Sequence, residues 1–114
     1  MSDCLFCRIV KGDIPCEFVY KDERVVAFRD INPVAPVHIL IIPIQHIQSV
    51  IALNKENAGV VADIFVAAQQ LAEQMGLDKN GFRIVTNTGK DGGQTVEHLH
   101  YHLLGGRSLQ WPPG

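Results

Sequence analysis

The sequence predicts an α+β fold in which a mainly antiparallel sheet of five to six strands carries one long helix and one short N-terminal helix. Three observations support this fold: one long stripe of apolar residues at helical spacing, several strand-like segments joined by short turns, and one segment of strict polar–apolar alternation. At 114 residues the chain is long enough for one hydrophobic core. We therefore expect a single domain over residues 1–114, with residues 108–114 as an extended C-terminal tail.

The composition excludes several classes of protein. A net charge of -2 and the lack of any run of Lys or Arg predict that no polymeric nucleic acid is a partner. The longest apolar run, Ile39–Ile44, is far too short to cross a membrane, and the N-terminus has no segment resembling a signal peptide. Three cysteines, an odd number without a secretory signal, favour reduced thiols and a cytoplasmic location.

The first expected element is a short helix over Leu5–Val10, because Gly12 and Pro15 follow as helix-ending residues. It carries a Cys-x-x-Cys pair, Cys4 and Cys7. A redox motif of the thioredoxin type should follow a strand, and almost nothing precedes this pair. Two interpretations stay open at this point: half of a tetrahedral zinc site, or two small buried residues of a helix.

Two strand-like segments follow, Glu17–Lys21 and Arg24–Arg29, and Asp22-Glu23 between them predicts a hairpin. The second segment runs into Asp30, which the Asn-Pro pair after it places in a turn. Asp30 has two possible roles, an Asx-type turn former or a carboxylate that accepts hydrogen bonds from the two hydroxyls of a ribose.

A nearly all-apolar strand is expected over His38–Pro43, and its composition predicts a central position with both faces buried. Two histidines bracket it, since His38 begins the strand and His46 follows it closely. Either histidine could be an incidental polar residue at the end of a strand, but two of them at the same element favour a functional role.

The long helix is expected to begin near Asn54, a plausible N-cap, and to end at Gly76. Phe82–Asn87 is then a strand, and the glycine-rich segment Thr88–Thr95 is a flexible connection whose backbone N–H groups can approach an anion closely. The helix should bury one apolar stripe: Val60, Val61, Ile64, Phe65, Ala68, Leu71, Ala72 and Met75.

The last expected strand contains three histidines in alternation with apolar residues. Because residues two apart on a strand share a face, His98, His100 and His102 should project together. The alternate residues should point into a core on the opposite face: Leu99, Tyr101 and Leu103. Three imidazoles in a row on one face indicate a functional site.

Two chemistries could use such a face. In the first, histidines and a carboxylate bind a zinc ion that activates water. In the second, one neutral imidazole attacks phosphorus, and its neighbour contacts phosphate oxygens or handles a proton. The glycine-rich segment and Thr95 would then hold the phosphoryl group, and Asp30 a ribose. The second chemistry uses more of the unusual residues at once.

The segment His98–Leu104 resembles the signature of the histidine triad (HIT) family, and the rest of the chain resembles its Hint branch of nucleotide-binding proteins. That branch has a HIT-like fold. The resemblance implies a homodimer whose strands join into one sheet, and hydrolysis of purine nucleoside phosphoramidates and related adenylates through a nucleotidyl-histidine intermediate. Further matching segments are Ala27–Ile31, Ala35–His38, Ile42–His46, Asn87, Asp91–Gln94 and Trp111–Gly114.

The resemblance also implies the roles of individual residues. His100 would be the nucleophile, His102 would contact the phosphate, and His38 would join the catalytic histidines from behind. The purine nucleotide would be bound by Phe28, Asp30, Ile31, Asn87, Gln94 and Thr95, with Phe28 and Ile31 at the base and Asp30 at the ribose.

Relatives that keep an N-terminal Cys-x-x-Cys imply a structural zinc ion on Cys4, Cys7, His46 and His98, and no organic cofactor. Hint proteins without zinc lack the two cysteines, so this chain combines a zinc-type N-terminus with a Hint-type tail. Two alternatives stay open: a zinc-dependent hydrolase, and a non-catalytic nucleotide-binding or scaffolding module.

Overall fold

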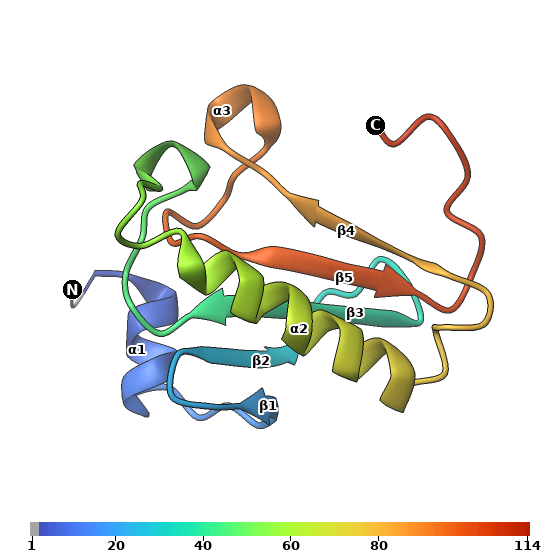
Figure 1. Cartoon of the computed structure of the whole chain (residues 1–114), viewed down its shortest axis with the longest axis horizontal. Helices are drawn as coiled ribbons and strands as arrows, with labels where there is room; N and C mark the ends of the chain where they lie inside the picture. The colour runs from blue at the N-terminus through green and yellow to red at the C-terminus, as the bar shows by residue number, and fades with distance from the viewer. Residues whose placement is uncertain (1–2) are drawn as a thin grey trace.

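The computed structural model describes residues 3–114, and in them a five-stranded antiparallel sheet has the order β1-β2-β3-β5-β4 (Figure 1). The long helix α2 crosses one face of the sheet, and the short helix α1 lies at one end of it (Figure 1). The predicted fold class is confirmed, at the lower end of the expected strand number. The strands are β1 (Phe18–Lys21), β2 (Val25–Arg29), β3 (Val37–Pro43), β4 (Phe82–Thr86) and β5 (Tyr101–Gly105). The helices are α1 (Leu5–Lys11), the 3-10 helix η1 (Val50–Ala52), α2 (Gly59–Gln74) and α3 (Gly89–Gly92).

Both faces of the sheet bury apolar side chains, and the two sets alternate along β2 and β3 as the period of two requires. The face toward α2 buries, among others, Val25, Ala27, Ile39, Ile41 and Leu103. The face toward α1 buries Val26, Phe28, Leu40 and Ile42, packed with Phe6 and Ile9. His38 of β3 alternates with Ile39, so its side chain belongs to the face toward α1.

Helix α1 matches its predicted position. Cys4 is its N-cap, and the Cys4 sulfur accepts a hydrogen bond from the Cys7 main-chain N–H at 3.3 Å. Gly12 ends the helix with φ of 88°, a left-handed conformation that glycine adopts without steric cost. The N-terminal cap therefore uses one of the two cysteines of the Cys-x-x-Cys pair.

Helix α2 begins at Gly59, so the predicted start at Asn54 is wrong. The Asn54 side chain accepts hydrogen bonds from the main-chain N–H groups of Glu56 and Asn57, and so caps a separate turn ahead of the helix. The apolar stripe is largely as predicted, but Phe65 is 46% exposed and is not core. The buried residues of α2 are Val60, Ile64, Ala67, Ala68, Leu71 and Ala72.

The histidine-containing strand β5 begins only at Tyr101, so the prediction that one strand carries all three histidines is wrong. Tyr101 still pairs with Ile41 of β3 and Thr86 of β4. If the same register continued, Leu99 would lie opposite Pro43, which has no N–H to donate to a hydrogen bond between the strands. The Leu99 N–H instead donates to the carbonyl of Ile47. The alternation of faces continues through the irregular segment. Leu99 is buried in the core toward α2, while the buried side chains of His98 and His100 pack against Phe6 of α1.

The glycine-rich segment 88–95 is also more regular than predicted, because Gly89–Gly92 forms the single helical turn α3. Gln94 closes this turn: its main-chain N–H donates to the Gly89 carbonyl at 3.0 Å, and its side-chain oxygen accepts from the Gly89 N–H at 2.9 Å. Gly93 follows the turn with φ of 81°. The segment is therefore held by Gln94 rather than being a flexible connection.

Residues 107–114 form no helix or strand, and they lie at the end of the sheet opposite α1 (Figure 1). The Arg83 guanidinium of β4 donates to the carbonyl of Gln110, and Trp111 beyond it is 81% exposed. Between residues 3 and 114, no helix is both long and apolar enough to span a membrane.

Candidate active site and metal cluster

Three histidine side chains meet on the sheet face opposite α2. His102 of β5 pairs in register with Leu40 of β3, which puts it diagonally opposite His38. The Nε2 atom of His38 lies 2.9 Å from the Nδ1 atom of His102. The ring of His102 is in turn 5.1 Å from the ring of His100, measured between centroids. Two neighbouring central strands and the segment before β5 therefore bring the predicted catalytic histidines together.

Main-chain groups determine which nitrogen of each of these rings carries the proton. The Val34 N–H donates to His38 Nδ1 at 3.2 Å, so a neutral His38 carries its proton on Nε2. That Nε2–H donates to His102 Nδ1, which leaves His102 with its proton on its own Nε2. The pair is thus arranged so that the distal nitrogen of His102 is a hydrogen-bond donor.

His100 has the complementary arrangement. Its Nδ1 lies 2.7 Å from the carbonyl oxygen of His98, and a carbonyl can only accept, so Nδ1 carries the proton. The Nε2 atom of a neutral His100 then has a free lone pair. The Thr86 hydroxyl donates to the His100 carbonyl at 2.8 Å, and the Phe6 ring packs edge-on against the imidazole at 5.1 Å. These contacts orient His100 from three sides.

Burial favours the neutral forms of His38 and His102. It lowers the pKa of His102 to about 4, and the neighbouring His100 and His38 act in the same direction, while Asp30 opposes them. Burial likewise lowers the pKa of His38 against the opposing effect of Asp30. A neutral imidazole has one donor and one acceptor nitrogen, so near neutral pH both rings keep the proton positions that the main chain selects.

Asp30 combines a turn-forming contact with a position beside the histidines. One carboxylate oxygen accepts from the Asn32 N–H at 2.8 Å, which is the Asx-type turn considered from the sequence. The other oxygen lies 3.4 Å from His38 Nε2. His38 and His102 could form a metal-binding group with Asp30. However, their nitrogens are closer than the about 3.4 Å expected for two ligands of one tetrahedral ion, and they fit a hydrogen bond instead.

The remaining predicted nucleotide-binding residues differ in their exposure and in their contacts. Phe28 is buried and contacts Phe6, whereas Ile31 is 91% exposed in the loop after β2. Gln94 donates its side-chain amide to the carbonyls of Gln48 and Val96. Thr95 lines two grooves of about 590 and 790 Å³. Among residues 3–114, the side chains of Gln94, Thr95 and Asn87 make no hydrogen bond to the site histidines.

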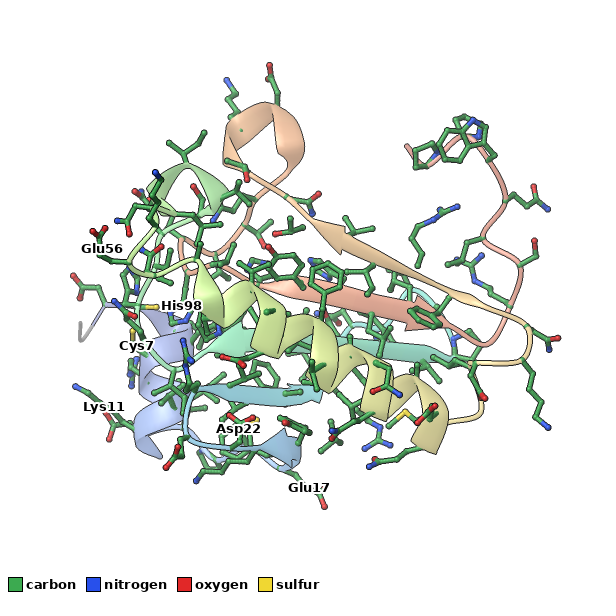
Figure 2. All side chains as sticks on the ribbon, viewed as in Figure 1. Cys7, Lys11, Glu17, Asp22, Glu56 and His98 are labelled. Carbon is green, nitrogen blue, oxygen red and sulfur yellow. The ribbon has the colours of Figure 1, made fainter. Side chains whose placement is uncertain are left out.

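A second cluster joins α1 to the segment before β5. Cys4, Cys7, His46 and His98 each offer one ligand atom, and these atoms all lie within 4.8 Å of one another. Cys7 and His98 are buried, and Figure 2 shows them together beside α1. The structure therefore brings together the four residues that were predicted to bind metal.

The spacing of this cluster fits a tetrahedral zinc ion. Sulfur and nitrogen ligands about 2.1–2.3 Å from zinc are separated by about 3.4–3.8 Å. The Nδ1 atom of His98 lies 3.4 Å from the Cys4 sulfur and 3.6 Å from the Cys7 sulfur, and His46 Nδ1 lies 3.3 Å from the Cys7 sulfur. His98 Nε2 lies 2.9 Å from the Pro43 carbonyl, so Nε2 carries the proton and Nδ1 is free to bind a metal.

Two residues that touch His100 were not identified from the sequence, Phe6 and Thr86. Phe6 lies between the two cysteines, and its edge contacts with Phe28, His98 and His100 depend on how α1 packs. Thr86 ends β4 directly opposite Tyr101, so its hydroxyl reaches the preceding carbonyl. The only sequence signal for Thr86 was its place near the end of an expected strand. Phe6 gave no signal beyond its apolar character.

Residues 11–109 match the HIT domain family. An uncharacterized HIT-like protein of Synechococcus elongatus is 48% identical over 113 residues, which cover 99% of this chain and 98% of that protein. A HIT family hydrolase from Legionella pneumophila has a crystal structure that covers 98% of this chain and 100% of its own, with 47% identity and a TM-score of 0.95. The crystal structure of a histidine triad nucleotide-binding protein from Candida albicans covers 96% of this chain and 83% of its own, with 30% identity and a TM-score of 0.82.

The lowered pKa of His102 predicts how stability depends on pH. Between about pH 6.5 and about pH 4 the unfolded imidazole binds a proton and the folded one does not, so the free energy of unfolding falls as the pH falls through this window. In His102→Gln this loss should be smaller by roughly 1–3 kcal/mol, because the group is gone from both states. Urea unfolding of both proteins at intervals between these pH values measures the difference, since all carboxylates are common to both. Parallel pH dependences would contradict a buried neutral His102.

Proposed function

The chain belongs to the HIT domain family, and from this premise we propose that it hydrolyses purine nucleoside phosphoramidates and related adenylates through a nucleotidyl-His100 intermediate. The names of two similar proteins, a hydrolase and a nucleotide-binding protein, support the class of activity. The observation that carries the proposal is the pair of complementary imidazoles. His100 has a free Nε2 lone pair and His102 has an Nε2–H donor, on rings 5.1 Å apart.

The reaction follows from these two nitrogens. The lone pair of His100 Nε2 forms a bond to phosphorus while the bond from phosphorus to the leaving nitrogen breaks, and the leaving nitrogen takes a proton from solvent water to depart as an amine. His102 Nε2–H donates to a phosphate oxygen, where negative charge increases in the transition state. Water then adds to phosphorus, the bond to His100 breaks, the electron pair of that bond returns to His100 Nε2, and the added water releases its proton to the solvent. A histidine–phosphorus bond is labile enough for this second step to regenerate the enzyme.

The nucleoside would lie along the loop after β2. Phe28 and Ile31 offer apolar surface for a purine, and the large exposure of Ile31 is consistent with a side chain that a ligand covers. Asp30 keeps one carboxylate oxygen beside His38, at a side-chain exposure of 20%, and would accept hydrogen bonds from the ribose.

The phosphate would lie between the histidines and the segment after β4. Thr95 is exposed at the edge of its grooves and can donate its hydroxyl, and Asn87 at the end of β4 can donate its side-chain amide. Gln94 would act mainly by holding α3 in place, because its side chain is already bonded to the main chain at three positions.

Zinc is the metal that we propose for the cluster of Cys4, Cys7, His46 and His98. Two thiolates and two imidazoles are a usual structural zinc set, and four protein ligands leave no position for an activated water. Bound zinc would join α1 to the segment that carries the nucleophile and supply no step of the reaction. Cys16 lies outside the cluster, half-buried against the apolar residues on the α1 face.

We further propose that two chains form a homodimer through β4 and α2. β4 is an edge strand, so one row of its main-chain hydrogen-bonding groups has no partner within the sheet. The outward surface of α2 and the start of β4 expose Phe65, Val66 and Phe82. A second copy could extend the sheet and cover these apolar side chains at the same time.

Replacing the nucleophile tests the activity. In His100→Ala, hydrolysis of an adenosine phosphoramidate should fall by at least about a thousandfold with nucleotide binding nearly unchanged, because no other group can form the covalent intermediate. His102→Ala should retain more activity and fall by about a hundredfold, since it removes one donor to the phosphate. Steady-state kinetics and calorimetric binding of AMP measure both. If wild-type protein binds AMP and turns over no phosphoramidate, the scaffolding alternative holds instead.

The zinc proposal predicts one zinc ion per chain by elemental analysis. Cys4→Ser/Cys7→Ser should lose the metal and lower Tm by at least about 5 °C, because metal binding contributes to folding. Cys16→Ser is the matched control and should keep both metal and Tm. The double variant should also keep measurable turnover at a temperature where it is folded. If the folded double variant, or folded wild-type protein after chelation of its metal, loses all turnover, that result would instead favour the zinc-dependent hydrolase.

The dimer proposal predicts that sedimentation equilibrium yields twice the 12.6 kDa mass of one chain. Val66→Glu should shift the protein to the single-chain mass, because a charge would be buried in the interface. Ile51→Glu is the control, since Ile51 is 84% exposed on η1, an element outside the proposed interface. A single-chain mass for the wild type, or equal effects of the two substitutions, would remove this interface.

A further inference from the structure

We propose that Arg107 is a positioning residue for the His38–His102 pair, because it holds the Val34 main chain that selects their proton positions. Arg107 follows the end of β5 and is itself exposed. It reaches back to the loop between β2 and β3 and would contact no substrate. The inference rests on the proposed function only in what it says about turnover; its structural part concerns the resting protein.

The first observation is that both polar groups of one loop residue are engaged. The Arg107 guanidinium donates to the Val34 carbonyl at 2.9 Å, and a second guanidinium nitrogen donates to the Ser108 carbonyl at 3.0 Å. The Val34 N–H donates to His38 Nδ1 at 3.2 Å. A chain of contacts therefore runs from Arg107 through Val34 to His38, and from His38 to His102.

The second observation is a close approach at the neighbouring residue. Gly106 has φ of 93°, and a Cβ atom built on it would lie 2.8 Å from the Pro36 Cβ. Val37 pairs with Gly105, so the end of β5 and the end of the β2–β3 loop lie side by side (Figure 1). A glycine here lets the two segments pack closely enough for Arg107 to reach Val34.

Few other contacts hold Val34 in place. Its side chain is 60% exposed, and the loop around it contributes only Ala35 as a buried apolar residue. The two main-chain hydrogen bonds of Val34 therefore fix its position together with the packing of Pro36 against Gly106. The hydrogen bond from the Arg107 guanidinium to the Val34 carbonyl is charge-assisted, so it is stronger than the bond from the Val34 N–H to His38.

Release of Val34 would permit the opposite proton arrangement. His38 could then carry its proton on Nδ1 and accept at Nε2 from His102 Nδ1–H, with the same nitrogen–nitrogen contact. His102 Nε2 would become a lone pair and would repel a phosphate oxygen. Asp30, 3.4 Å from His38 Nε2, still favours the original arrangement, so the change should be partial.

Side-chain ¹⁵N NMR near pH 7.5 tests the structural part without any substrate, because the chemical shifts of Nδ1 and Nε2 distinguish the two neutral forms. Wild-type His38 and His102 should both carry the proton on Nε2. In Arg107→Ala a fraction of each should shift to Nδ1–H, and Arg107→Lys, which keeps one cationic donor, should recover most of the wild-type pattern. Arg83→Ala is the matched control: Arg83 also donates to a tail carbonyl, that of Gln110, and does not contact Val34.

Turnover of an adenosine phosphoramidate supplies the second readout. Arg107→Ala should lower kcat by about 2- to 10-fold, the equivalent of one modest hydrogen bond, with KM changed by less than about twofold. Arg107→Lys should restore kcat, and Arg83→Ala should keep it.

The proposal is overturned if wild-type His38 carries its proton on Nδ1, or if Arg107→Ala keeps the wild-type proton positions. Equal effects of Arg83→Ala and Arg107→Ala would overturn it too, since they would assign the change to the tail in general. If the wild type turns over no phosphoramidate, the proposed function fails while the NMR result still decides the role of Arg107.

Discussion

The hydrogen bond from His100 Nδ1–H to the carbonyl of His98 is the contact on which the candidate active site depends. It leaves the lone pair of His100 on Nε2, where a nucleophile needs it. A carbonyl inside a sheet ladder would be committed to a neighbouring strand. Because the ladder stops at Tyr101, the carbonyl of His98 is available to the side chain two residues further on. The late start of β5 is therefore part of how the site is built.

His98 also connects this hydrogen bond to the cysteine cluster. Its Nδ1 faces the two sulfurs, its Nε2 is bonded to Pro43, and its main-chain oxygen holds His100. Phe6 of helix α1 packs edge-on against the rings of both His98 and His100. The N-terminal helix thus contacts the His100 ring through Phe6 and is linked to His100 Nδ1 through His98, so a structural metal bound by Cys4, Cys7, His46 and His98 would stabilise the position of His100.

The sequence alone determined the fold class and which side chains share a face. The alternation around Leu99 was enough to predict that His98, His100 and His102 share a face, because the period of a strand is a local property. The position of His38 beside them was expected only from the family resemblance. The helical stripe of α2 and the Gly12 stop of α1 followed from equally local preferences. The Cys4 and Cys7 spacing similarly indicated two thiols within reach of one ion.

Only the tertiary structure decided where β5 begins and which nitrogen carries each proton. The start of β5 depends on Pro43, in a strand far away in the sequence. The start of α2 differs, because it follows from a local turn that the Asn54 side chain caps. The proton positions depend on the main-chain groups of His98, Pro43 and Val34. Every residue has such groups, so their use leaves no sequence signal, and only the folded arrangement shows which of them meet an imidazole.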